Sequence, residues 1–166
     1  EAASQGHEFT RDIGCLIKLA DYAAKRSRKL YEAIFAYALF FQTVDRHQLA
    51  INYYDKILEF KPDTHQAWYN RGNALSALQR YEEAIGSYDR ALEVKPDYHK
   101  AWYSKSLAYA RLECIDVALE NLARAVHIEP KVIELAKSNT DFERMRSHPR
   151  FQALIYGKPD SQSDDD

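Results

Sequence analysis

Apolar positions in this chain follow a helical spacing, and the spacing itself repeats. In residues 65–98, Trp68, Gly72 and Leu75 recur at i, i+4 and i+7, which places them on one face of a helix. The next stretch keeps an apolar face through Tyr81, Ala84, Ile85, Tyr88, Ala91 and Leu92. The pattern predicts two helices that pack against each other through these faces.

The same pattern recurs along the chain at a fixed interval. Pro62, Pro96 and Pro130 keep a 34-residue spacing, and so do Trp68 and Trp102. Because proline cannot donate the hydrogen bond that a continuing helix needs, each proline is expected to end a helix pair. Aligning the prolines gives three units, at residues 31–64, 65–98 and 99–132. The predicted helices are Tyr31–Val44, Gln48–Phe60, Gln66–Leu78, Tyr81–Val94, Lys100–Arg111 and Ile115–Ile128.

Small and polar residues add detail to this pattern. Gly72 and Ala84 are expected where two helices approach closely, with larger neighbours filling the flanking gaps. Polar residues just before two predicted helices are expected to cap them through a side-chain oxygen. The candidates are Asp63 or Thr64 for the helix at 66–78 and Asp97 for the helix at 100–111. A 34-residue period of helix pairs predicts an all-α, right-handed superhelix of stacked repeats with a concave groove.

The best-defined unit is similar to a known repeat. Residues 65–75, followed by Tyr81–Ile85 and Ala91–Pro96, resemble a near-consensus tetratricopeptide repeat (TPR) of the kind found in bacterial multi-repeat proteins. Unit one departs from that pattern at Ile34 and Ala38, which replace the tryptophan and the glycine. The resemblance implies a non-catalytic scaffold that binds a segment of a partner protein in the concave groove.

The resemblance also implies which residues line the groove, because particular positions of each first helix face it in this family. Position 5 is aromatic in all three units, and a row of rings suits a peptide because aromatic side chains bury large area at low entropic cost. These rings could equally pack against neighbouring helices, and both interpretations stay open. The groove residues carried over are Phe35, Leu39, Gln66, Tyr69, Asn73, Lys100, Tyr103 and Arg111.

One subclass of partner is disfavoured. Chaperone co-factors of this family hold a C-terminal carboxylate with a lysine and an asparagine of the first unit. Phe35 and Leu39 occupy those two places here, although Asn73 and Lys100 remain. The two-carboxylate clamp is incomplete, which argues against heat-shock chaperone tails.

The ends of the chain are expected to protect the repeats from water. Residues 1–30 are predicted to hold an N-terminal capping helix, and residues 133–157 are predicted to form C-terminal capping helices. Residues 158–166 are expected to form a disordered acidic tail. The N-terminal helix is indicated by apolar residues at helical spacing within residues 9–30, namely Ile13, Leu16, Ile17, Ala20, Ala23 and Ala24.

A basic run offers a second candidate surface, made of Lys25, Arg26, Arg28 and Lys29. Four cations in five residues could contact an acidic partner, a phosphate or a membrane surface. The alternative is the solvated C-terminal end of a helix, where the helix dipole favours cations.

Composition limits the function classes. A formal net charge of −2 gives no broad attraction to nucleic acid, and none is expected as a partner. The six histidines form no recognisable catalytic or metal motif, and the chain lacks a glycine-rich phosphate loop. We therefore predict no catalytic residue, no metal site and no cofactor.

Cysteine content and hydropathy bear on the compartment. Cys15 and Cys114 are interpreted as two buried thiols in a reducing compartment. The longest apolar run, residues 33–41, is too short to span a bilayer, and no signal peptide is visible. These observations favour a cytoplasmic location. Two alternatives to an autonomous scaffold remain: a regulatory or assembly domain of a larger enzyme, and a structural module that self-associates as a homo-oligomer.

Overall fold

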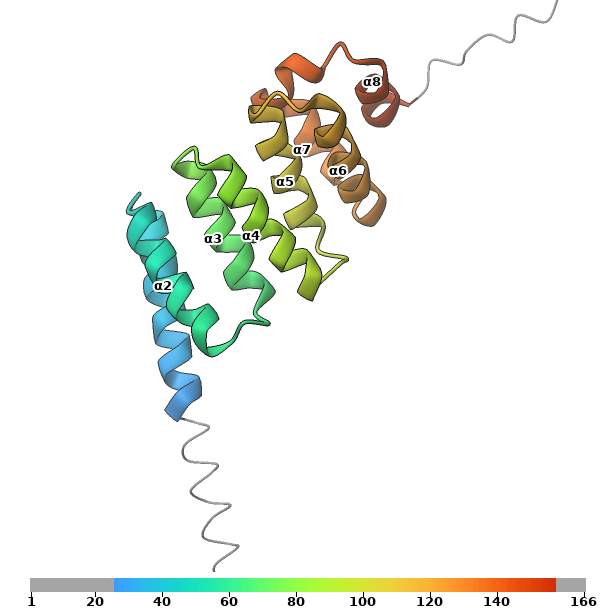
Figure 1. Cartoon of the computed structure of the whole chain (residues 1–166). Coiled ribbons are helices and arrows are strands. Elements are labelled where there is room, and N and C mark those ends of the chain that lie inside the picture. Colours follow the sequence, from blue (N-terminus) through green and yellow to red (C-terminus); the bar gives the residue numbers. More distant parts are fainter. Residues whose placement is uncertain (1–25, 158–166) are drawn as a thin grey trace, which may run out of the picture.

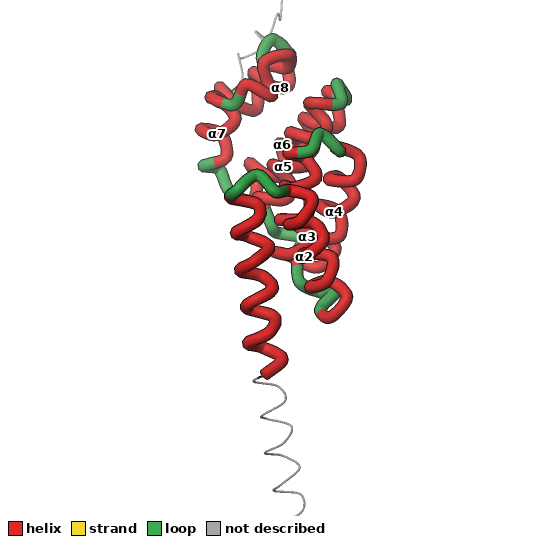
Figure 2. Tube along the Cα trace, turned by 90° about the vertical axis from the view of Figure 1, so that its left-hand side faces the viewer, coloured by secondary structure: helices red, strands yellow, loops and turns green. Residues whose placement is uncertain are grey.

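The computed structural model describes residues 26–157, which form helices joined by short loops (Figure 1). No strand occurs between residues 26 and 157 (Figure 2). The predicted bounds of the five helices from α2 to α6 are confirmed to within one residue. The elements are helix 26–43, α2 (His47–Phe60), α3 (His65–Ala77), α4 (Tyr81–Val94), α5 (His99–Arg111), α6 (Ile115–Ile128), α7 (Val132–Ser138), η1 (Thr140–Met145) and α8 (Pro149–Tyr156).

Each helix pair turns at the same repeat position. Asp45, Gln79 and Glu113 are equivalent in the three units and have positive φ values of 57°, 60° and 61°. This left-handed conformation is unfavourable for side chains with a Cβ atom, and glycine adopts it more readily. The second helices α2, α4 and α6 end at Phe60, Val94 and Ile128, just before the prolines.

The periodic tryptophans are tied to the periodic prolines. The indole N–H of Trp68 donates a 2.8 Å hydrogen bond to the carbonyl of Pro62, and Trp102 does the same to Pro96 at 2.8 Å. The guanidinium of Arg90 lies 5.6 Å from the centroid of the Trp68 ring. Each tryptophan therefore links the first helix of one helix pair to the loop that follows the preceding helix pair.

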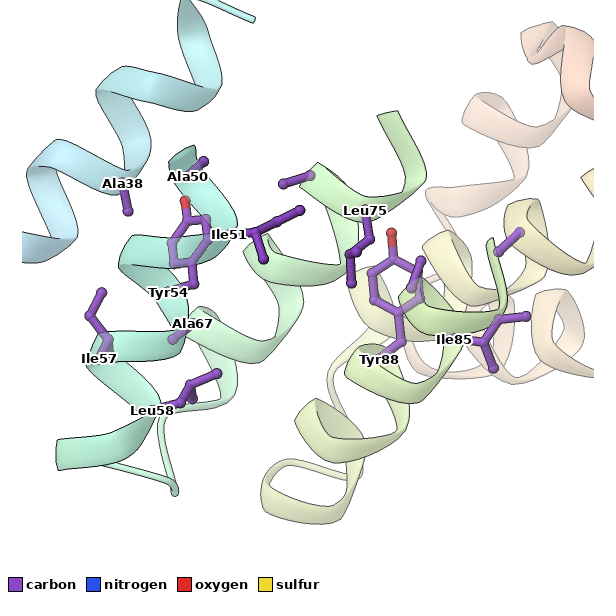
Figure 3. Close-up of a cluster of buried hydrophobic side chains, with 13 residues drawn as sticks. Ala38, Ala50, Ile51, Tyr54, Ile57, Leu58, Ala67, Leu75, Ile85 and Tyr88 are labelled. Carbon is purple, nitrogen blue, oxygen red and sulfur yellow. The ribbon is translucent and has the colours of Figure 1, made fainter. Parts of the chain in front are cut away.

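The core lies between successive helices and consists of alanine, branched aliphatic and tyrosine side chains. Figure 3 shows Tyr54 and Tyr88 among buried residues such as Ala38, Ala67 and Leu75. The prediction of close approach at Gly72 is confirmed, because a Cβ atom there would lie 2.5 Å from Cε1 of Tyr88. Ala84 is fully buried, as that prediction requires.

The far end of the stack is closed by short elements. Both α7 and α8 contact α6, and η1 packs on α5. The side chains of Phe142, Met145 and Phe151 are fully buried there. This end therefore has a core of its own.

Three expectations are wrong in detail. The expected side-chain caps are absent: neither α3, preceded by Thr64, nor α5, preceded by Tyr98, receives a side-chain cap hydrogen bond. The backbone carbonyls of Thr64 and Tyr98 accept hydrogen bonds from the first turn of each helix instead. Cys114 is exposed because it occupies the solvent-facing turn before α6, whereas Cys15 lies outside the described residues. No boundary falls at residue 30, because one helix runs through residues 26–43, a stretch without glycine or proline.

Candidate peptide-binding face

The groove residues predicted from sequence lie on the first helix of each pair, and we call this set the first-helix face. Helix 26–43 carries Phe35 and Leu39; α3 carries three of the set, and α5 carries the other three. The two helices α3 and α5 contact each other directly. The set comprises exposed Leu39, Gln66, Lys100 and Arg111, and half-buried Phe35, Tyr69, Asn73 and Tyr103.

The aromatic row is partly engaged in packing. Phe35 meets the ring of Tyr54 edge-on with centroids 6.0 Å apart, and Tyr69 lies 6.1 Å from Tyr88. Tyr69 also makes a T-shaped contact with Tyr98 at 5.2 Å. The packing interpretation therefore holds for part of each ring. Half-burial leaves the remainder of each ring accessible to a ligand.

Asn73 is oriented by a buried tyrosine. The hydroxyl of Tyr88 donates a 3.0 Å hydrogen bond to Oδ1 of Asn73. Burial raises the pKa of Tyr88, and the nearby hydroxyls of Ser104 and Ser76 oppose that shift. Within the described part of the chain, Nδ2 of Asn73 makes no hydrogen bond, so this amide keeps its two N–H groups as donors.

A related bond anchors the first pair. The hydroxyl of Tyr54 donates a 2.8 Å hydrogen bond to Oε1 of Gln42 on helix 26–43. Burial raises the pKa of Tyr54 to about 12. Second-helix tyrosines thus reach first-helix amides in two pairs, whereas Leu122 holds that position in the third.

The C-terminal segment engages the first-helix face at its far end. Asn139 donates a 3.0 Å hydrogen bond to the hydroxyl of Tyr103, and Phe142 meets the Tyr103 ring edge-on at 5.9 Å. Arg111 forms an ion pair with Asp141. A pocket of about 430 Å³ between α5 and η1 is lined by both of these charged residues. Sequence reasoning identified residues 133–157 as a cap without foreseeing that they would engage two of the predicted groove residues.

Ion pairs between successive pairs were missed by sequence reasoning. Asp55 pairs with Arg71 at 2.6 Å, and Asp89 pairs with Lys105 at 2.6 Å. The aspartate and the cation each recur at the repeat interval, a signal that was available in the sequence. These bonds fix α2 against α3 and α4 against α5, and so set the spacing of the first helices.

His65 lies beside this face, at the start of α3. Its ring makes a T-shaped contact with Tyr98, with centroids 5.0 Å apart. Burial lowers the pKa of His65, and the nearby charge of Lys95 lowers it further, while Asp97 opposes the shift. The neutral imidazole is favoured, which suits an aromatic packing residue.

The basic run is only partly described. Arg26, Arg28 and Lys29 are exposed on helix 26–43, and Arg28 pairs with Glu32 at 2.9 Å; Lys25 lies outside the described residues. The interpretation as a helix C-terminus is wrong, because the helix continues to residue 43. The helix dipole therefore does not account for these cations.

Two further observations concern the chemistry of residues 26–157. No group of histidine, cysteine, aspartate or glutamate side chains in this range is arranged to hold a metal ion. None of the helices in the same range has the length and apolar character needed to cross a membrane.

Comparison with known proteins agrees with this geometry. Residues 65–98 match the tetratricopeptide repeat family, and no curated protein sequence matches the chain. The first TPR domain of Spaghetti (RPAP3), solved bound to the HSP90 peptide SRMEEVD, is 17% identical, with a TM-score of 0.60 over 76% of this chain and 90% of that one.

Two other solved structures are similar. A MamA RS-1 double mutant is 21% identical, with a TM-score of 0.65 over 76% of this chain and 72% of that one. The TPR2B domain of yeast Sti1, in its pHsp70 complex, is 21% identical, with a TM-score of 0.59 over 76% of this chain and 94% of that one. At these identities the likeness concerns the fold.

The stacked helix pairs and their fixed period define an all-α helical-repeat superhelix. Within that class, residues 65–98 match the tetratricopeptide repeat family, and the described chain has the fold of TPR domains.

Proposed function

We propose that this protein is a non-catalytic scaffold that binds a segment of a partner protein on the first-helix face of α3 and α5. The observation that carries the proposal is the arrangement around Asn73. Its Oδ1 accepts from buried Tyr88, so the amide is held with Nδ2 as a donor. Half-buried Tyr69 lies on the same helix, and exposed Lys100 lies on the neighbouring one.

This arrangement favours a particular partner chemistry. Amide N–H groups and a lysine ammonium bind carbonyl and carboxylate oxygens, and an aromatic ring between them binds an apolar side chain. A peptide that alternates apolar residues with carbonyl or acidic acceptors would use all three groups. Because the stacked helices are rigid, most of the ordering cost falls on the ligand.

The site is centred on α3 and the start of α5. Tyr103 and Arg111 already bind the chain's own Asn139 and Asp141, so a partner would have to displace these contacts to use them. The proposed binding set consists of the residues that make no such contact with residues 139–141, namely Gln66, Tyr69, Asn73 and Lys100.

Peptide binding by two similar folds supports the proposal. The RPAP3 domain was solved with an HSP90 peptide, and the Sti1 domain in a complex with pHsp70. Phe35 and Leu39 leave the two-carboxylate clamp incomplete here, so we propose a different peptide partner. The free thiol of exposed Cys114 agrees with a reducing, cytoplasmic setting, which belongs to the same proposal.

The proposal is tested by affinity capture from the lysate of the native host. The full chain is compared with an Asn73→Ala, Lys100→Ala variant and with a control variant, Lys131→Ala, that removes an exposed lysine before α7. Loss of the same captured partner from the double variant only supports the first-helix face. Retention by all three proteins would place binding elsewhere.

A further inference from the structure

Helix 26–43 and α2 form the N-terminal end of the stack (Figure 1). Large apolar side chains of both helices are exposed at this end. Leu30 is 57% exposed, Tyr37 is 57% exposed and Phe60 is 73% exposed. An apolar pocket of about 300 Å³ lies at this end, and its lining includes Leu30, Ile34 and Phe60. We call this surface the N-terminal edge. Contiguous exposed apolar patches of this kind mark interaction sites.

The interior junctions show what covers the equivalent face elsewhere. The second helix of one pair packs on the first helix of the next, α2 on α3 and α4 on α5. At each junction an aspartate of the second helix pairs with a cation, Asp55 with Arg71 and Asp89 with Lys105. The N-terminal edge is therefore a first-helix face that lacks its preceding second helix.

Tyr37 holds the repeat position of these two cations, one repeat interval before Arg71. The Tyr37 ring stacks on the ring of Tyr53, with centroids 6.0 Å apart. In the next pair the equivalent residues, Arg71 and Ser87, also contact each other. A phenol hydroxyl donates a strong, charge-assisted hydrogen bond to a carboxylate. The edge thus suits an apolar helix that carries an aspartate opposite Tyr37.

Residues 13–24, which lie outside the described residues, have the sequence of such a helix. They follow the second-helix pattern at the 34-residue interval, and they keep the aspartate that the interior junctions use. The aligned sets are Ile17 with Ile51 and Ile85, Asp21 with Asp55 and Asp89, and Ala23 with Ala91 and Ala125. The occupant that fits the edge is therefore encoded in this chain.

The connection to helix 26–43 decides which copy supplies that occupant. The other junctions turn at Pro62 and Pro96, whereas Arg28 takes the corresponding place here. The helix is continuous from residue 26 to residue 43, and residues 15–25 contain neither glycine nor proline. The sequence provides no turn that would bring residues 13–24 back onto their own edge.

We propose that residues 13–24 of a second copy of this chain dock on the N-terminal edge, so that two copies exchange these segments reciprocally. The exchange generates a closed two-fold dimer, because each edge receives the segment that the other copy supplies. The partner's Asp21 lies opposite Tyr37, where interior junctions have an ion pair.

The test measures the molar mass of the full chain by light scattering and sedimentation over a range of concentrations. Leu30→Glu and Tyr37→Glu place a carboxylate on the N-terminal edge. Matched controls at the other end are Leu135→Glu and Tyr156→Glu, because Leu135 is 57% exposed and Tyr156 is 58% exposed. The expected result is a wild-type dimer that both edge variants weaken roughly tenfold or more, while both controls remain dimers. Tyr37→Glu acts by like-charge repulsion with the partner's Asp21, and Leu30→Glu acts by placing a carboxylate in an apolar contact.

A charge exchange separates this proposal from a loss of folding. Asp21→Lys should weaken the dimer, and combining it with Tyr37→Glu should restore it as a reversed pair. Tyr37→Arg alone should keep the dimer, since it recreates the interior ion pair. A monomeric wild type at every concentration, equal effects of edge and control variants, or a failure of the reversed pair would overturn the proposal. A monomer that deletion of residues 1–24 destabilises would show instead that the segment covers its own edge.

Discussion

Tyr88 on α4 and Asn73 on α3 are joined by a 3.0 Å hydrogen bond from the phenol hydroxyl to the amide oxygen. This bond connects the core to the proposed binding face. The Tyr88 ring lies against Gly72, one residue before Asn73, so packing and hydrogen bonding act on the same turn of α3. A change in the core at this point should therefore alter the surface on which a partner is proposed to bind.

The close approach at Gly72 predicts a strong effect of one methyl group. Gly72→Ala places a Cβ atom 2.5 Å from the Tyr88 ring, and the ring must move. We expect the free energy of unfolding to fall by about 1–3 kcal/mol, as for other overpacked cores. Denaturant unfolding followed by circular dichroism measures this change.

Gly86→Ala is the matched control on the next helix. A Cβ atom at Gly86 meets nothing within 4 Å, and the residue is exposed within α4. The same substitution should therefore stabilise the fold by about 0.5–1 kcal/mol, because alanine is a better helix former than glycine. If both variants changed stability in the same direction, the assignment of the Gly72 contact would be wrong.

The left-handed turn between α3 and α4 predicts a stabilising substitution. Gln79 has a φ of 60° and an exposed side chain. Gln79→Gly should raise the free energy of unfolding by a few tenths to about 1 kcal/mol, because relief of the unfavourable conformation exceeds the added freedom of the unfolded chain. Thermal unfolding measures this change in stability, with Glu82→Gln, an exposed substitution on α4, as the control. A lower melting temperature for Gln79→Gly would contradict the observed turn.

Buried tyrosines predict a loss of stability at alkaline pH. Burial raises the pKa of Tyr54 to about 12 and also raises the pKa of Tyr88, whereas the unfolded side chains ionise near 10.0. Because the folded state favours the neutral phenols, their contribution is fully present below pH 10 and is lost as pH rises from about 10 towards about 12. Unfolding by urea across this pH range measures the loss.

The Tyr88→Phe variant should show a shallower alkaline loss, since phenylalanine does not ionise. Its stability at neutral pH should also be lower by about 1 kcal/mol, because the bond to Asn73 is gone. Tyr156→Phe is the control, because the Tyr156 side chain on α8 is exposed, and this variant should keep the wild-type slope. Identical slopes for all three proteins would mean that Tyr88 does not resist ionisation.

The stack was largely predictable from sequence, since the 34-residue spacing of Pro62, Pro96 and Pro130 located the helices from α2 to α6. These prolines could be interpreted from sequence because proline lacks the backbone N–H that a continuing helix needs, and this effect is the same in every unit. The break predicted between residues 30 and 31 was wrong, because no proline or glycine interrupts the helix there. The contact of Asn139 with Tyr103 was also missed, because it depends on how a non-repeating segment turns back onto α5.

The incomplete clamp predicts how the HSP90 peptide SRMEEVD, bound by the RPAP3 domain, would behave with this chain. The wild type should bind it weakly. Phe35→Lys combined with Leu39→Asn restores the two missing clamp residues beside Asn73 and Lys100, and should raise the affinity roughly tenfold or more through charge-assisted contacts. Calorimetric titration of both proteins measures the difference.

Two controls accompany this titration. Leu39→Asn alone should fold normally, because Leu39 is exposed, whereas Phe35→Lys removes a ring contact with Tyr54 and its folding must be checked by circular dichroism. Tight binding of SRMEEVD by the wild type would show that a chaperone tail can be held without these clamp residues. A folded double variant with no gain would show that Asn73 and Lys100 do not take part in such a site.

The central claim is that a partner segment binds across α3 and the start of α5. It is tested most directly by the dissociation constant of a peptide from a captured partner, measured calorimetrically with the wild type and with the Asn73→Ala, Lys100→Ala variant. We predict that the variant stays folded, with a free energy of unfolding lower by about 1 kcal/mol because the Tyr88 hydroxyl loses its acceptor on Asn73. The affinity should fall roughly tenfold or more, since central polar anchors at an interface carry about 2 kcal/mol or more. An equal dissociation constant for the two folded proteins would contradict the claim.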